Sequence, residues 1–131
     1  MEAEITSLQG QISTWNREIE EYNALKGQLE AIVSSLNAAK NELRTVQFHV
    51  GVNYTSDNAP GDRNAIASLS SKIEKIITEI TGNVYTGIDN KITEKTNKIS
   101  NAQARITHLQ NEIARLAREA AEAAAAAAGG Q

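Results

Sequence analysis

Few side chains of this chain have the type and spacing that chemistry requires. His49 and His108 lie in different regions, and neither belongs to a recognisable metal-ligand motif. Serine, threonine and aspartate are abundant, but no nucleophile motif accompanies them. Gly82 and Gly87 lack the Lys–Ser/Thr pair that completes a phosphate-binding loop. The sequence therefore predicts a non-enzymatic protein without a metal or cofactor.

Tyr85 and Asp89 are a spaced pair that could carry a signal. A separation of four residues on a helix places the ring and the carboxylate side by side on one face. The same spacing between two common residue types also arises by accident. The pair is therefore either a recognition signal or an ordinary part of a helix surface.

Composition excludes several classes of function. The net charge of −3 over 131 residues does not favour phosphate contacts, so we expect no nucleic acid partner. The chain has no cysteine, which removes disulfide and thiol chemistry. No apolar run approaches the roughly 20 residues that cross a bilayer, and the acidic N-terminus lacks the features of a secretory signal. We therefore expect no membrane insertion.

Apolar residues at steps of three and four form two long stripes, the strongest pattern in the sequence. Such steps keep side chains on one face of a helix, so each stripe predicts one long amphipathic helix. A loop with turn formers and the single proline separates the stripes. The predicted fold is all-α, a long antiparallel helical hairpin of coiled-coil type. The first stripe is Ile5, Leu8, Ile12, Trp15, Ile19, Tyr22, Leu25, Leu29, Ile32, Leu36, Ala39, Leu43, Val46 and Val50; the second is Ile66, Leu69, Ile73, Ile76, Ile80, Val84, Ile88, Ile92, Ile99, Ala102, Ile106, Leu109, Ile113 and Leu116.

The hairpin is predicted to form one domain over residues 1–128. Phe48 and Gly51 are expected at the entrance of its loop, as an aromatic and a turn residue. The expected parts are a helix at about 2–47, a loop at about 51–62, a helix at about 63–127 and a disordered tail at 129–131.

Two irregularities interrupt the stripes. Between Tyr22 and Leu25 a second consecutive step of three predicts a stammer, which is a local overwinding of the supercoil. Near residues 81–87 the second helix is expected to kink, because glycine and threonine are poor helix formers. Successive steps of four from Ile80 to Ile92 support this kink. Either the loop or the kink could be the tip of the hairpin.

Two paired helices bury little surface per residue, so the stripes are expected to bind a further amphipathic helix. Trp15 is either a core residue of the hairpin or an anchor in a pocket of the partner. The residues expected to form the partner-binding surface are Trp15, Ile19, Ile106, Leu109, Ile113 and Leu116.

An acidic helical hairpin without cysteine or signal peptide, and with a glycine-containing bend, resembles the ESAT-six-like, WXG-type superfamily of type VII secretion. The likeness covers about residues 1–120 and is closest to the small hairpin proteins that accompany LXG toxins. The Trp-x-Gly turn of the family is missing; His49-Val50-Gly51, preceded by Phe48, is the nearest match. Tyr85-Thr86-Gly87-Ile88-Asp89 matches the Tyr-x-x-x-Asp export signal, although it lies within the second helix and not after it.

The resemblance implies a targeting factor or chaperone. Such a protein binds the helical N-terminal domain of an LXG-type toxin, together with a second small helical protein in some cases, and helps present the toxin for export. It implies a location in the bacterial cytoplasm, with co-secretion through the type VII system left open. The alternative from the residues is a structural, homo-oligomeric coiled-coil spacer.

Overall fold

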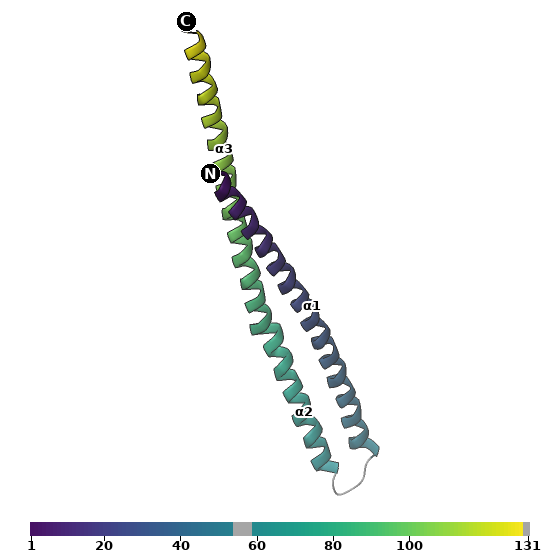
Figure 1. The fold of residues 1–131 in the computed structure, drawn as a ribbon. Helices are drawn as coiled ribbons and strands as arrows, with labels where there is room; N and C mark the ends of the chain where they lie inside the picture. Colours follow the sequence, from purple (N-terminus) through teal and green to yellow (C-terminus); the bar gives the residue numbers. More distant parts are fainter. Residues whose placement is uncertain (54–58, 130–131) are drawn as a thin grey trace. The chain divides into compact units, whose positions relative to one another are not determined.

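The computed structural model describes residues 1–53 and 59–129, with side chains described for residues 1–47 and 61–129. Every described residue except Met1 is helical (Figure 1), which confirms the predicted all-α class. The elements in chain order are helix α1 (Glu2–Asn53), helix α2 (Ala59–Glu79), the π-helical turn η1 (Ile80–Val84) and helix α3 (Tyr85–Gly129).

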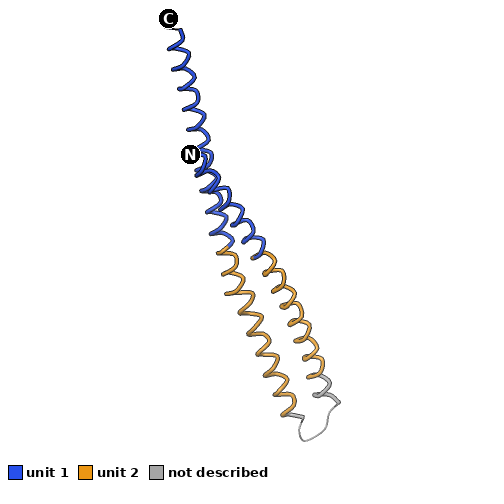
Figure 2. Tube along the Cα trace, viewed as in Figure 1, with its two compact units in different colours: residues 1–21, 92–131 blue, residues 22–91 orange. Residues whose placement is uncertain are grey.

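The chain divides into two compact units, each an antiparallel pair of helical segments (Figure 2). Unit 1 joins residues 1–21 to residues 92–131, and unit 2 comprises residues 22–91. In unit 2, Lys40 of α1 forms an ion pair with Glu74 of α2. This pairing places the hairpin tip between α1 and α2, so the alternative tip at 81–87 is excluded.

The helices are longer than expected. α1 continues to Asn53, past its predicted end at 47, and α2 begins at Ala59, before its predicted start at 63. Pro60 lies in the first turn of α2, where a missing N–H costs no intrahelical hydrogen bond. Phe48 and Gly51 therefore lie in α1 and not in a loop, and the side chain of Phe48 is outside the described ones. At the other end α3 reaches Gly129; the rest of the expected tail, 130–131, is also outside them.

The predicted kink near 81–87 is a π-helical turn within continuous helix. A π-turn accommodates one extra residue while the backbone stays helical. Val84 and Tyr85 are both half-buried, so two consecutive residues share one inward position. The Thr81 hydroxyl donates a 2.9 Å hydrogen bond to the Ile77 carbonyl, which bends the local backbone away from ideal helix geometry.

The predicted stammer in α1 is wrong. Residues that face the opposite helix continue in unbroken steps of four and three past Tyr22, with Lys26 next and not Leu25. Leu25 is 43% exposed and Ile32 is 49% exposed. From Leu25 onward, some apolar residues lie one position before the inward residue. The spacing of the inward residues themselves does not change. The inward residues of α1 in unit 2 are Tyr22, Lys26, Leu29, Val33, Leu36, Lys40, Leu43 and Gln47.

The cores of both units are small and come from α2 and α3. Relative exposure of the buried side chains lies between 3% and 9%, and α1 adds half-buried residues from the other side. Large apolar residues with relative exposures of 42% to 50% occur in both units, among them Leu25, Ile32, Ile76 and Leu116. The buried residues are Ile73, Ile77 and Ile88 in unit 2 and Ala102, Ile106 and Leu109 in unit 1.

Candidate functional site

An apolar groove opens beside Trp15 in unit 1. Its volume is about 430 Å³. Ala102 is 5% exposed and lies at an inward position of α3, where its methyl group is too small to fill the space beside the indole. Trp15 is half-buried, as are the neighbouring inward residues Leu8, Ile12 and Ile19 of α1. The lining residues are Leu8 and Trp15 from α1 and Lys98, Asn101, Ala102 and Arg105 from α3.

Charged side chains form the rim of this groove. The Arg105 guanidinium donates a 3.0 Å hydrogen bond from Nε to the Glu4 carboxylate, which raises the pKa of Arg105 and lowers that of Glu4. Lys98 Nζ lies 3.3 Å from Glu94 Oε1 on the same helix. An apolar floor within a polar rim is the arrangement found where proteins receive an apolar side chain.

The other residues expected at the partner-binding surface divide into two groups. Ile106 is 9% exposed and Leu109 is 3% exposed, so the chain's own core uses both of them. Ile19 and Ile113 are half-buried, and Leu116 is 42% exposed. The surface accessible to a partner in unit 1 therefore centres on Trp15, with Leu116 as a separate exposed residue.

Tyr85 and Asp89 share one contact in unit 2. The Lys26 ammonium donates a 2.9 Å hydrogen bond to Asp89 Oδ1 and lies 5.7 Å from the centre of the Tyr85 ring, within range of a cation–π interaction. The hydrogen bond to Asp89 is the main reason that the pKa of Lys26 is raised. The spacing of Tyr85 and Asp89 thus has a structural use, whether or not it is also a signal.

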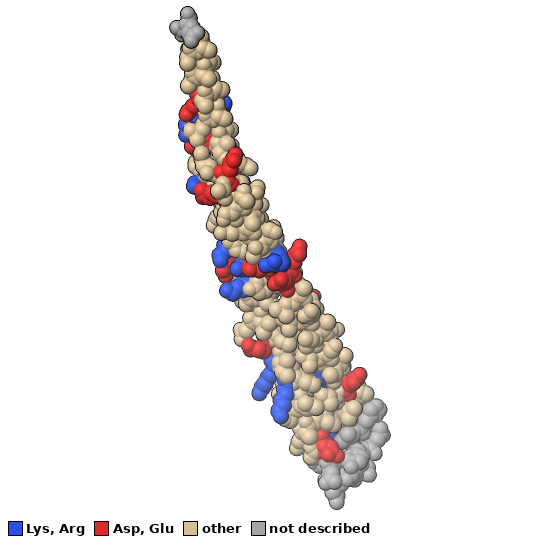
Figure 3. Space-filling view, in the orientation of Figure 1, with Lys and Arg blue, Asp and Glu red and all other residues tan. Residues whose placement is uncertain are grey.

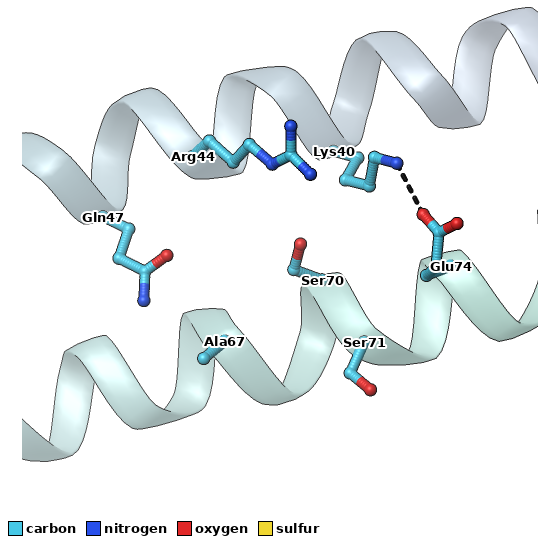
Figure 4. A pocket seen from close by; sticks show the side chains of 7 residues that line it. All are labelled: Lys40, Arg44, Gln47, Ala67, Ser70, Ser71 and Glu74. Atoms are coloured by element: carbon cyan, nitrogen blue, oxygen red, sulfur yellow. Dashed lines mark hydrogen bonds and ion pairs between the residues drawn. The ribbon is translucent and has the colours of Figure 1, made fainter.

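A polar notch of about 390 Å³ lies between α1 and α2 in unit 2 (Figure 4). Lys40 and Gln47 occupy inward positions of α1 opposite the small side chain of Ser70, so apolar packing is interrupted here. The sequence analysis missed this notch because it followed apolar residues alone, although Lys26 and Lys40 lie fourteen residues, or two heptads, apart in the sequence. The lining residues are Lys40, Arg44, Gln47, Ala67, Ser70, Ser71 and Glu74.

The ion pairs predict a loss of stability in acid. Hydrogen bonds from Arg105 and from Lys40 hold the pKa of Glu4 and of Glu74 below the ordinary value of 4.5. A carboxylate with a lowered folded-state pKa stabilises the fold above 4.5, and this contribution disappears as the pH falls through the folded-state pKa. The melting temperature should therefore change little between about pH 7 and about pH 5, and it should fall below about pH 5.

Replacing both carboxylates tests this assignment. The double variant Glu4→Gln and Glu74→Gln should melt lower than the native chain at neutral pH and show a shallower decline in acid. An unchanged acid profile in the variant would assign the decline to other groups.

The described residues contain no group of three or more histidine, cysteine, aspartate or glutamate side chains that could hold a metal ion. Within the same residues, no helix combines the length and apolarity needed to cross a membrane. No family model, curated protein or solved structure matches the chain.

Proposed function

We propose that this chain is a non-enzymatic partner protein that binds an amphipathic helix of a second polypeptide through unit 1. The observation that carries the proposal is the apolar groove beside Trp15, with its half-buried indole and small Ala102. Tryptophan is enriched among the residues that dominate protein–protein binding.

The resemblance to the WXG-type superfamily supplies the finer part of the proposal. On that basis the bound helix belongs to the N-terminal domain of a type VII secreted toxin, and the chain acts as a targeting factor or chaperone that helps present the toxin for export. Tyr85 and Asp89 are the candidate export signal. Because Lys26 contacts both side chains, a receptor that reads this signal has to compete with Lys26.

A structural spacer is the second candidate function. The unbroken register of inward residues along α1 favours it, because rod-like spacers maintain one heptad register over long distances. The π-turn η1 does not occur in a regular spacer, since it shifts the register of the second helix by one residue. The spacer predicts self-association and no binding to a toxin domain.

Substitution of Ala102 by leucine tests the groove. Leucine should fill the space beside Trp15, so the free energy of unfolding should stay the same or rise by up to about 1 kcal/mol. The affinity for a partner helix should nevertheless fall by about tenfold or more, because leucine would occupy the groove that receives the partner's side chain. The measurement is calorimetric titration with the helical N-terminal domain of an LXG toxin.

Opposite effects on stability and on affinity cannot come from misfolding. Ala104→Leu is the matched control, since Ala104 lies on the same helix but is exposed; it should bind as the native chain does. If native protein and the Ala102→Leu variant bind the toxin domain equally well, the partner uses another surface. If neither binds, the proposed function is wrong.

A further inference from the structure

The polar notch of unit 2 brings hydrogen-bond donors of both helices to one gap. Lys40, Arg44 and Gln47 line the notch from α1, and Ser70 lines it from α2. In Figure 4 the Arg44 guanidinium and the Ser70 hydroxyl point toward each other across the gap, and the Gln47 carboxamide points from α1 toward α2. Among the described residues, the side chains of Arg44 and Ser70 have no hydrogen-bond or ion-pair partner, so their donors are free for a ligand.

The gap is the result of a small side chain at an inward position. Ser70 is half-buried and belongs to the row of inward residues of α2 that also contains Ile73 and Ile77. An isoleucine at this position would fill the gap, bury more apolar surface and stabilise the pair of helices. The chain lacks this stabilisation and holds polar donors there instead. Stability lost in exchange for binding groups is a common property of functional sites.

Positive charge exceeds negative charge around the notch. Residues 36–47 of α1 and 65–77 of α2 contain four cationic and two acidic side chains, which gives a local net charge of +2 in a chain of net charge −3. In the view of Figure 3, Lys and Arg side chains project from α2 in this part of unit 2. A local excess of this sign attracts anions. The charged residues are Lys40, Glu42, Arg44, Lys72, Glu74 and Lys75.

One of the two cations at the notch already has an acid, and this acid is easily displaced. Lys40 pairs with Glu74; the side chain of Lys40 is 16% exposed, and that of Glu74 is 53% exposed. Packing therefore holds the lysine at the notch, whereas the glutamate has room to turn into solvent. The hydrogen bond from Lys40 lowers the pKa of Glu74, and the charge of Arg44 adds to this effect without direct contact. An anion that replaces Glu74 gains both cations.

We propose that the notch binds a phosphate group. The guanidinium of Arg44 donates to two oxygens at once, an arrangement that matches phosphate geometry. The Ser70 hydroxyl on the opposite helix donates to a third oxygen, and Lys40 supplies the second positive charge. A carboxylate has only two oxygens and does not reach donors on both helices in this way. Two cations balance the charge of a phosphate dianion once Glu74 has turned away.

The bound phosphate connects α1 to α2, because its oxygens contact donors of both helices. A ligand that binds only the folded pair raises the melting temperature by mass action. The group can belong to inorganic phosphate or to a phosphate monoester, since both present the same oxygens. The site lies wholly within unit 2 and does not depend on the Trp15 groove, so its failure and the failure of the proposed function are separate results.

Titration of the native chain with inorganic phosphate, glycerol phosphate and acetate tests the site, with the ionic strength held constant by sodium chloride. Both phosphates should saturate in the millimolar range, as expected for an exposed site, and acetate should bind at least about tenfold more weakly. Nuclear magnetic resonance should show the shifts at Arg44 Nε–H and at Ser70. Tighter binding of glycerol phosphate would identify a phosphorylated molecule as the natural ligand, and the reverse order would identify the free anion.

Two substitutions should change the affinity for phosphate in opposite directions. Arg44→Gln removes the bidentate donor and should weaken binding by about tenfold or more. Glu74→Gln removes the competing carboxylate and should strengthen binding by about threefold or more. Arg63→Gln is the matched control, because it removes the same charge from an exposed residue of α2 outside the notch; the affinity should change by less than about twofold.

The opposite signs separate a binding site from a folding defect, which would weaken binding in both variants. Absence of saturation with either phosphate would overturn the proposal, as would equal affinities for phosphate and acetate. A Glu74→Gln variant that binds phosphate no better than the native chain would also contradict it, because the glutamate would then not compete for the cations of the notch.

Discussion

The variant Leu109→Glu should lose more than about 3 kcal/mol of unfolding free energy, because the carboxylate enters the core of unit 1 without a partner. Leu109 has the lowest exposure among the buried core residues, 3%. For a chain of this length the loss lowers the melting temperature by about 10 °C or more. Far-ultraviolet circular dichroism measures it directly, since the described residues are almost entirely helical.

Leu116→Glu is the matched control on the same helix. Leu116 is 42% exposed, and α3 carries the adjacent Arg115, whose ion pairs with Glu112 and Glu119 stabilise the helix locally. This control should change stability by no more than about 0.5 kcal/mol. Equal losses in the two variants would falsify the burial of Leu109 against α1.

Deletion of Gly27 should destabilise the chain by more than about 4 kcal/mol, whereas deletion of Gly82 should change stability by less than about 1 kcal/mol. Both glycines are exposed, with open space where a side chain would start. Removing one residue from the regular α1 rotates all residues on one side of the deletion by about 100°, so an entire row of inward residues turns outward.

Gly82 differs because it lies in the π-turn η1. Its deletion removes the extra residue, and Tyr85 takes the inward position that it now shares with Val84, while Ile88 and Ile92 stay inward. Chemical denaturation of the two deletion variants measures the difference. A Gly82 deletion as damaging as the Gly27 deletion would mean that η1 does not act as a one-residue insertion.

The sequence predicted the class of fold because steps of three and four are a local property of helices. It could not predict which residue of an ambiguous pair faces inward. At Leu25 and Lys26 the apolar residue appeared to be the inward one, but the ion pair of Lys26 with Asp89 and the unbroken register of α1 decide for the lysine. The ion pair is a long-range property that depends on a residue more than sixty positions away.

The candidate site could be predicted only in part, again because burial depends on contacts between residues far apart in the sequence. Trp15 was recognised from its residue type, and the structure places it beside a groove. Ile106 and Leu109 were assigned to a partner-binding surface. An apolar stripe does not reveal which of its residues are buried within the chain and which are free to bind a partner. The exposure of Leu25, Ile32, Val46, Leu69 and Ile76 in unit 2 was not predicted, because all five had been counted in the two apolar stripes.

The two inward lysines of unit 2 have a consequence for how the chain folds. Repeats of seven residues allow two helices to slide by one heptad and still match apolar rows, so alignments of similar energy compete. A slide of this size moves Lys40 from Glu74 to Ala67 or Thr81, and Lys26 from Asp89 to Gly82 or Thr96. Each mistaken alignment leaves ammonium groups without acids, so the lysines exclude the slipped forms at some cost in stability to the correct one.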